Sequence, residues 1–343
     1  MSSSSRVAAP SAPPAGWAEL VRDDPNATPA HRSELWDAWC AADPTLVPTL
    51  LTVERDGELI GGTPVVCERR GGLTWLHALP WVLSGAPLAQ PGRHAEVDEE
   101  IARQLASLQR ERHVVGGAWA LYRPDGPPPD PGVIERLSGH TRTVETALVD
   151  LNGGLDGARR RIDRKTRQNL AQAQRTLAIA EEPEALAAAY ALHVRQAQAW
   201  RARRPLPLEV SRRLLAAGGR PPCARLFTAR DRHGLLAAVL VLDHPREAML
   251  WWSGTHVDGR ARSAFTALAW GIVEWAAAAG RARVNLGASP MLGGVAAFKE
   301  SLGARIVSYP VRWLDARHAP LAGRVAGWLQ EQVRRGRPRG EPA

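Results

Sequence analysis

Lysine is nearly absent from this 343-residue chain. Only two of its 44 basic residues, Lys165 and Lys299, are lysines, and all the others are arginines. A chain with this bias uses arginine wherever any cation suffices, so each lysine is a candidate for a task that needs a compact ammonium group. The three cysteines lie far apart in the sequence and form no CxxC pair. They exclude a disulfide framework and a zinc ribbon, and they fit a reducing cytoplasm.

Several other motifs are missing as well. The sequence has no HExxH or HxxxH pattern, no GxSxG elbow and no Walker loop, and its ten histidines are scattered. We therefore predict no metal site and no permanently bound cofactor. The longest apolar run, 264–279, is interrupted by Glu274 and predicts a buried helix instead of a membrane span. Residues 1–16 lack the apolar core of a signal peptide and are expected to be a disordered leader, so we predict a cytoplasmic protein.

The charge is unevenly distributed along the chain. Residues 1–150 hold 13 basic and 20 acidic side chains, whereas residues 151–343 hold 31 basic and 15 acidic ones. An anionic partner is therefore expected to be drawn to the second half. The basic run Arg334–Arg339 near the C-terminus could add nonspecific affinity for RNA or for an anionic membrane surface, or it could bind nothing.

One pattern of elements occurs twice along the chain. Each copy has an amphipathic helix, a three-stranded meander, a helix, a strand, a helix that begins with Gly-Val, and a closing strand. In the first meander Asp56-Gly57 is a strong hairpin signal. The paired segments are 31–42 and 184–203, 49–80 and 224–254, 96–112 and 263–279, 114–121 and 283–286, and 131–151 and 293–314.

This repetition predicts the fold class and the domains. Strand meanders interleaved with helices indicate a mixed α/β (α+β) protein of two tandem units, each a mixed sheet flanked by helices. We expect a first domain at 17–152 and a second domain with the active site at 153–318. A long arginine-rich helix should follow the joint, and residues 319–343 should form a C-terminal helix and basic tail.

The order of elements resembles the GNAT acyltransferase fold. The tandem pair, with GARRRIDRKTRQNLAQAQR at 157–175 and NLGASPMLGGVAAFKESLGA at 285–304, resembles the FemAB-like branch over roughly residues 15–315. That branch includes the aminoacyl-tRNA-dependent peptidyltransferases of peptidoglycan bridge formation and the BioF2-like (CelD-type) acetyltransferases. The resemblance implies an acyltransferase, and it does not distinguish one substrate from another.

Lys299 is the candidate catalytic residue. It lies on a helix that opens at Gly293-Gly294, just after a strand and a loop of small residues. Backbone N–H groups at such a helix start, together with an ammonium group, favour an anion or a developing oxyanion. The FemAB-like resemblance implies that Phe298 packs against the donor end while Lys299 stabilises the tetrahedral intermediate. The first copy lacks the Phe-Lys pair, so we expect the site in the second copy. The alternative is that Lys299 is a solvated helix residue.

The other lysine lies in the arginine-rich segment after the joint. Arg164, Lys165 and Arg167 are expected on a cationic outer face, opposite apolar residues that dock the helix. Such a face could hold the phosphates of a nucleotide-linked acceptor or of tRNA. A charge run of this kind is equally often a solvated surface.

Four polar or aromatic positions complete the candidate site. Trp251 and Trp252 are adjacent on a strand, so they should face opposite sides, and Trp252 is the candidate to line a substrate groove. The alternative is that both are core residues at a domain contact. Asn285 and Ser289 could bind a substrate carbonyl, or they could satisfy local backbone.

The donor remains open at this point. GNAT enzymes that use acyl-CoA normally carry Arg-x-x-Gly-x-Gly/Ala before the long helix, and the matching segment, 257–264, has arginines without paired glycines. Aminoacyl-tRNA and acyl-CoA are both candidates. We predict transfer of an acyl or aminoacyl group to an amine of an anionic acceptor, such as a cell-envelope or polysaccharide precursor. The alternatives are an acyl-CoA-dependent N-acetyltransferase on a small amine or amino sugar, and a non-catalytic RNA- or polymer-binding protein. The acceptor, the general base and the oligomeric state are not determined by the sequence.

Overall fold

The computed structural model describes residues 3–8, 13–77, 85–199, 205–217, 219, 221–288 and 293–316. The chain forms two compact units, and neither is a single stretch of sequence. Unit 1 consists of residues 43–143 with the described parts of 1–26 and 309–316, whereas unit 2 consists of residues 27–42 and 144–308.

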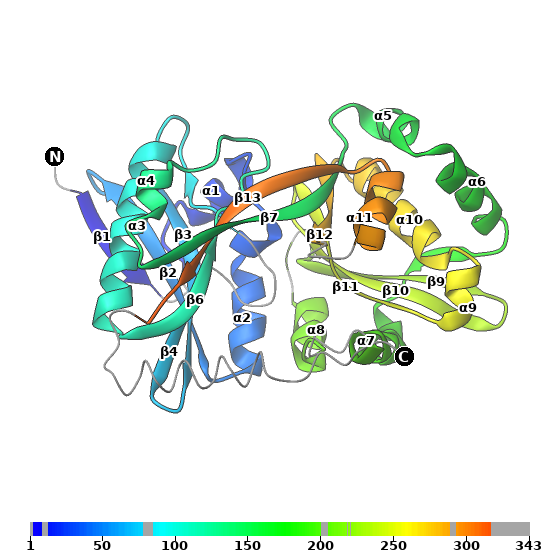
Figure 1. Ribbon diagram of the computed structural model, residues 1–343, viewed down its shortest axis with the longest axis horizontal. Helices are drawn as coiled ribbons and strands as arrows, with labels where there is room; N and C mark the ends of the chain where they lie inside the picture. The colour runs from blue at the N-terminus through cyan, green and yellow to red at the C-terminus, as the bar shows by residue number, and fades with distance from the viewer. Residues whose placement is uncertain are drawn as a thin grey trace. The chain divides into compact units, whose positions relative to one another are not determined.

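Unit 1 is a mixed sheet covered by a long helix (Figure 1). Its strands lie in the order β1 (Ser3–Ala8), β2 (Leu46–Arg55), β3 (Glu58–Arg70), β4 (Leu73–His77), β6 (Val114–Ala120) and the end of β13 (Arg305–Leu314). Strands β4 and β6 are parallel, and the short β5 (Leu88–Ala89) pairs with β3. Helix α3 (His94–Glu111) packs its apolar side on the sheet, and α1 (Trp17–Asp23) and α4 (Pro131–Ile134) complete the unit.

Unit 2 repeats this arrangement. Its strands lie in the order β7 (Gly139–Asp150), β12 (Arg283–Ala288), β11 (Glu247–Thr255), β10 (Gly234–Asp243), β9 (Ala224–Asp231) and β8 (Ala178–Glu181), and only β11 and β12 are parallel. Helix α10 (Ala264–Ala278) covers one face, while α7 (Leu186–Ala199) and α8 (Leu208–Ala216) lie on the other (Figure 1). The smaller helices are η1 (Pro29–His31), α2 (Ser33–Ala42), α5 (Gly154–Arg161), α6 (Arg164–Ala173), η2 (Pro183–Ala185), α9 (Val257–Ala261) and α11 (Gly293–Ser301).

The predicted duplication and the mixed α/β class are confirmed. Both meanders are present, and the hairpin at Asp56-Gly57 has both residues in the left-handed region, with φ of 52° and 84°. These are the values that a two-residue hairpin turn requires. The helix and strand that follow each meander begin and end within a few residues of the predicted bounds.

The closing strands do not stay with their own copies. Residues 146–150 of β7 pair with β12 in unit 2, and residues 311–314 of β13 pair with β6 in unit 1. Helix α2, expected to open the first copy, packs against α8 in unit 2. The observed division therefore falls within β7 and β13, instead of at the joint expected after residue 152. Ladder hydrogen bonds use the backbone, so an apolar strand pattern does not specify which copy the strand completes.

Two expected segments differ from the prediction. The long arginine-rich helix is divided into α5 and α6, because the Asp163 side chain accepts a hydrogen bond from the Thr166 N–H (2.8 Å) and starts a new helix. Part of the expected leader, residues 3–8, forms β1, which pairs with the edge of β2. The predicted tail at 319–343, including Arg334–Arg339, lies outside the described residues.

Candidate active site

The candidate site in unit 2 lies where two parallel strands part. Strands β11 and β12 pair at only three positions, Glu247 with Arg283, Ala248 with Val284 and Met249 with Asn285. Beyond these positions β11 continues to Thr255 beside β10, whereas β12 continues to Ala288 beside β7. The carboxyl ends of parallel strands are where open α/β sheets commonly place ligands.

A buried polar network fixes the point of divergence. The Arg283 guanidinium donates to Glu247 (2.8 Å), and both side chains are at most 2% exposed. The Asn285 amide donates to the other Glu247 oxygen (3.0 Å) and accepts from the Thr146 hydroxyl (2.7 Å). It also accepts a hydrogen bond from the N–H of Gly287 (2.9 Å), which holds the end of β12 in place.

This network shows how Asn285 is used. Its amide oxygen and nitrogen bond to neighbouring side chains and backbone, as in the second interpretation given for it above. Glu247 and Arg283 were not among the residues predicted from the sequence. A signal was available, since Arg283 and Asn285 alternate with the apolar Val284 and Leu286 and therefore share one face of a strand.

Lys299 lies at the same point. It is the seventh residue of α11, is only 6% exposed, and donates from Nζ to the carbonyl oxygens of Gly287 (2.6 Å) and Ala288 (3.0 Å). The interpretation of Lys299 as a solvated helix residue is therefore wrong. Because both acceptors are neutral carbonyl oxygens, these two bonds orient the ammonium group without neutralising its charge.

Phe298 precedes Lys299 on α11 and contacts a second phenylalanine. Phe298 packs against Phe265, the second residue of α10, with ring centroids 5.6 Å apart. The start of α10 has no side-chain cap, and its Ser263 cap residue adopts φ 53°. The first N–H groups of a helix have no partner within the helix, so this end favours an anionic group.

The neighbouring glycines and serine are only partly described. Gly293 and Gly294 form the first turn of α11, and a Cβ atom on Gly294 would meet nothing within 4 Å. Ser289 lies outside the described residues. Substrate binding by Gly293 and Gly294 stays a prediction.

The two tryptophans of β11 do not face opposite sides as predicted. A register shift leaves Trp251 without a partner on β10, so the strict alternation of side chains is interrupted there. Trp251 packs edge-on against Trp39 of α2. Trp252 is 4% exposed, donates to the Ser211 hydroxyl (3.1 Å) and lies 4.9 Å from the His193 ring. These are the contacts of a core residue.

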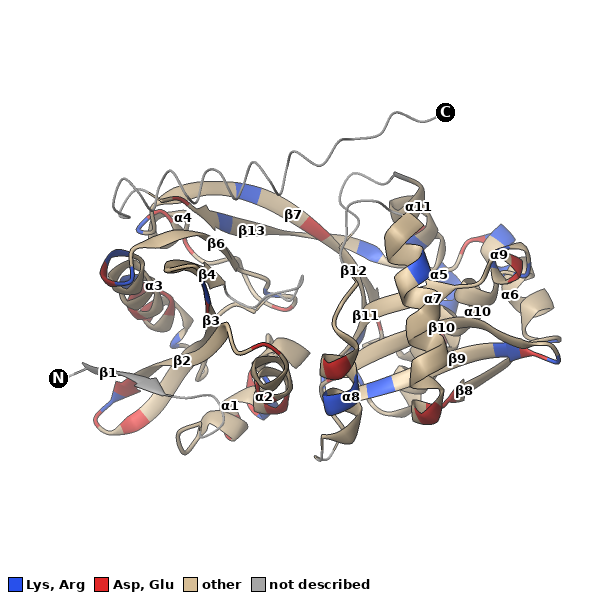
Figure 2. Cartoon of the chain, turned by 90° about the horizontal axis from the view of Figure 1, so that it is seen from below, with Lys and Arg blue, Asp and Glu red and all other residues tan. Residues whose placement is uncertain are grey.

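The predicted basic surface is present on α5 and α6 (Figure 2). Arg164, Lys165 and Arg167 are exposed, and the predicted docking residues Ile162, Leu170, Ala173 and Leu177 are buried. The Arg167 guanidinium donates to the Ile162 carbonyl (2.8 Å), so this side chain also closes the turn between the two helices. Asp163 N–H bonds to the Ser301 carbonyl (3.1 Å), which ties the start of α6 to the end of α11.

The described residues contain neither a metal-binding cluster nor a membrane-spanning helix. No group of three or more His, Cys, Asp or Glu side chains in the described ranges is placed to hold a metal ion. None of the helices that the structure describes has the length and hydropathy needed to cross a bilayer.

Comparison with known proteins places this fold. Residues 157–300 match the family described as Acetyltransferase (GNAT) domain, and no curated protein matches the chain. Among solved structures, FemX superposes with a TM-score of 0.67 at 10% identity, covering 85% of this chain and 94% of that one. The C-terminal domain of a putative lysylphosphatidylglycerol synthetase from Agrobacterium fabrum gives 0.53 at 15% identity, with 95% and 97% covered. A tandem GNAT protein from the clavulanic acid biosynthesis pathway gives 0.53 at 13% identity, with 92% and 99% covered.

Proposed function

We propose that this chain, whose residues 157–300 match the GNAT acetyltransferase domain and whose fold is similar to that of FemX, transfers an aminoacyl group to an amine of an anionic acceptor. The acceptor nitrogen attacks the donor carbonyl carbon, and the carbonyl oxygen becomes an oxyanion. When the intermediate collapses, the bond to the donor's leaving oxygen breaks, and that oxygen takes the proton lost by the amine. The product is an amide.

The observation that carries this proposal is the position of Lys299. Its ammonium group is buried and oriented by two carbonyls at the end of β12, where β11 and β12 part. A fixed positive charge at the place where negative charge develops stabilises the transition state without further reorganisation. The chain otherwise uses arginine for its basic residues, and the ammonium group of lysine is a more compact charge than arginine's planar guanidinium.

The donor and acceptor are assigned by charge. The exposed face of α5 and α6 offers Arg164, Lys165 and Arg167 to phosphates, which fits a tRNA donor of the kind that the FemAB-like resemblance implies. One similar structure is named a putative lysylphosphatidylglycerol synthetase, and the product in that name is an amino acid attached to an anionic lipid. An anionic cell-envelope precursor is our proposed acceptor.

A second candidate donor is acyl-CoA. The uncapped start of α10 follows β11 and lies beside the phenylalanine pair, where its N–H groups could bind a pyrophosphate. The short helix α9 occupies the segment in which the paired glycines of a CoA loop would be expected, so we rank this donor second.

Adding each donor separately to the purified protein tests the assignment. We expect charged tRNA to raise the melting temperature of the purified protein and, when cell extract supplies the acceptor, to yield an aminoacylated product by mass spectrometry, with acetyl-CoA giving neither. Lys299→Met should lower turnover roughly 100-fold or more while circular dichroism remains unchanged. Glu300→Gln, an exposed neighbour on α11, is the matched control. If Lys299→Met kept full turnover, the catalytic role would be refuted. If instead only Arg164→Glu with Lys165→Glu abolished the biological activity, the chain would be a binding protein.

A further inference from the structure

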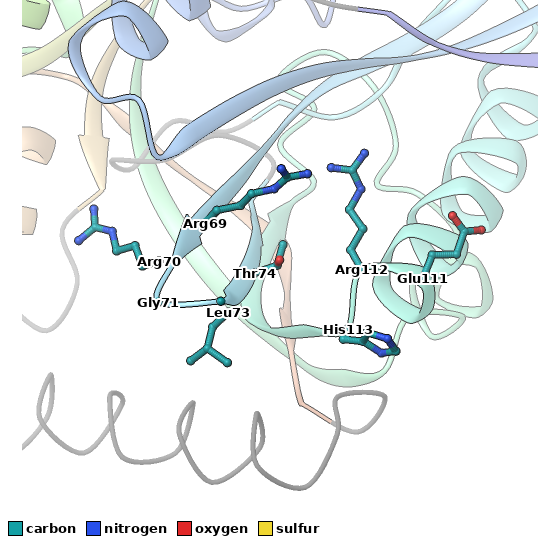
Figure 3. Close-up of a pocket in the computed structure, with 9 residues that line it drawn as sticks. Arg69, Arg70, Gly71, Leu73, Thr74, Glu111, Arg112 and His113 are labelled. Atoms are coloured by element: carbon teal, nitrogen blue, oxygen red, sulfur yellow. The ribbon is translucent and has the colours of Figure 1, made fainter.

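Unit 1 contains a hollow of about 490 Å³ that is separate from the groups discussed so far (Figure 3). It lies where the turn between β3 and β4 faces the end of α3. Two short segments line it, 69–74 and 111–113, and they contribute three arginines and one histidine. The volume is within the range of sites that bind substrate-sized ligands.

The sheet register brings two of these arginines together. Arg69 on β3 pairs with Thr74 on β4, and Thr74 pairs with Val114 on β6, two residues after Arg112. Arg69 also follows Cys67 by two residues, and Cys67 packs in the core beneath α3, so both side chains lie on the face that α3 covers. Figure 3 shows the guanidinium groups of Arg69 and Arg112 pointing toward one another.

The pKa of the nearby Cys67 depends on both arginines. Burial raises the pKa of the Cys67 thiol, and the positive charges of Arg112 and Arg69 both oppose this rise. Both guanidinium groups therefore lie close enough to affect the Cys67 thiol, although 43 positions separate them in the sequence.

Neither of these two arginines has a carboxylate partner in the part of the chain that the structure describes. Among the described residues, no carboxylate lies within ion-pair distance of the Arg69 or Arg112 side chain, and Nη1 of Arg112 is buried without a hydrogen-bond partner. The acid in the lining, Glu111, accepts a hydrogen bond from the Ser107 hydroxyl (2.6 Å) and is turned away in Figure 3.

The third lining arginine is different. Arg70 forms an ion pair with Glu68 (2.7 Å) and lies 3.5 Å from Asp43, and Glu68 also bonds to His77. Its charge is therefore compensated within the protein, as are most arginines on a surface. This contrast makes Arg69 and Arg112 the unusual pair, and it makes Arg70 a matched control.

Two converging like charges with a buried unsatisfied donor destabilise the empty site. An unpaired buried donor costs free energy that a bound acceptor would recover, and such groups in native proteins usually mark a partner. Guanidinium groups present their N–H donors in a planar fork that matches carboxylate and phosphate oxygens. Two adjacent guanidinium groups therefore match a ligand group that carries two negative charges.

We propose that this hollow, the Arg69–Arg112 pocket, binds the dianionic phosphoryl group of a phosphate ester. Arg69 and Arg112 contact the phosphoryl oxygens, and the Thr74 hydroxyl lies between them in the lining. Gly71 and Gly72 in the turn have no Cβ, and a Cβ at either would meet nothing within 4 Å, so the rest of the ligand has open space there. A carboxylate carries one negative charge and would leave one of the two arginines uncompensated.

Isothermal titration of the full-length protein with inorganic phosphate and pyrophosphate, at low ionic strength, tests this assignment. We expect saturable binding that Arg69→Ala and Arg112→Gln each weaken about tenfold or more, and that the double variant abolishes. Arg70→Ala and Arg103→Ala, whose arginines are paired with acids, should stay within about twofold. The Arg69 side chain is exposed, so its truncation does not threaten the fold.

Further binding experiments identify whether the phosphate belongs to a lipid or to a soluble ester. Vesicles of phosphatidylcholine with phosphatidic acid present the same dianion on a lipid, and binding of them that requires Arg69 would assign a lipid phosphate. Binding of soluble phosphate alone would assign a small soluble ester. Equal binding of acetate, no binding at millimolar phosphate, or equal loss in Arg70→Ala would each overturn the proposal. Phosphate should also raise the melting temperature of the wild type and leave that of the double variant unchanged.

Discussion

Replacing Glu247 with leucine should destabilise unit 2 strongly. Glu247 is 1% exposed and is the partner of Arg283, which is 2% exposed. Breaking a buried ion pair by removing one partner leaves an uncompensated charge and costs about 3–5 kcal/mol. The Asn285 amide also loses its acceptor, which adds about 1 kcal/mol.

Urea denaturation measures this loss of stability. With a slope of about 2 kcal/mol per molar urea, the unfolding midpoint should fall by about 2 M or more. Hydrogen exchange locates the effect, because peptides from β12 should lose protection while peptides from α3 in unit 1 serve as an internal control.

The double variant Glu247→Leu with Arg283→Met gives the sharper comparison. Removing both charges leaves no stranded ion, so its stability should return most of the way to the wild type. If the loss of unfolding free energy in the double variant equalled the sum of the losses in the two single variants, Glu247 and Arg283 would not be energetically coupled. A midpoint unchanged in Glu247→Leu would refute the buried network altogether.

Two further predictions concern the face of unit 2 that α7 covers. Gly254→Ala should lower the free energy of unfolding by roughly 1–3 kcal/mol, because the new Cβ would lie 2.5 Å from the carbonyl carbon of Leu192 and α7 would have to move. An unchanged melting temperature would contradict this close approach of α7 to β11. Burial lowers the pKa of His193, whose Nε2 accepts a hydrogen bond from the Leu206 N–H. At pH values below about 6.5 the unfolded state therefore binds more protons than the folded state, and the free energy of unfolding should fall as the pH drops. His193→Gln should flatten that dependence between pH 8 and pH 5, and a wild-type stability independent of pH over this range would contradict it.

Local sequence signals predicted most of the elements. The Asp56-Gly57 turn, the two meanders and the helix at 264–278 depend on neighbours within a few residues, and they were found near their predicted bounds. The division of the arginine-rich segment could have been predicted too, because Asp163 followed by Thr166 is a capping pattern.

The candidate site was only partly predictable. The scarcity of lysine singled out Lys299, and its burial beside the end of β12 agrees with a specific use. Its carbonyl partners could not be predicted, because they depend on how α11 packs against a strand twelve residues earlier. The contacts of Trp252 agree with the core interpretation, but the prediction that Trp251 and Trp252 face opposite sides was wrong, because a single extra residue in β11 changes which face each side chain occupies.

The sequence by itself determined that the chain holds two copies of one mixed α/β unit and that the candidate lysine, Lys299, lies in the second copy. Periodicity, turn residues and composition are local properties, so they can be recognised without knowing the fold. Only the tertiary structure decided that β7 and β13 complete each other's sheets, and that Arg69 and Arg112 converge. Backbone ladders accept any strand of suitable pattern, and side chains distant in sequence meet only when the sheet order is fixed.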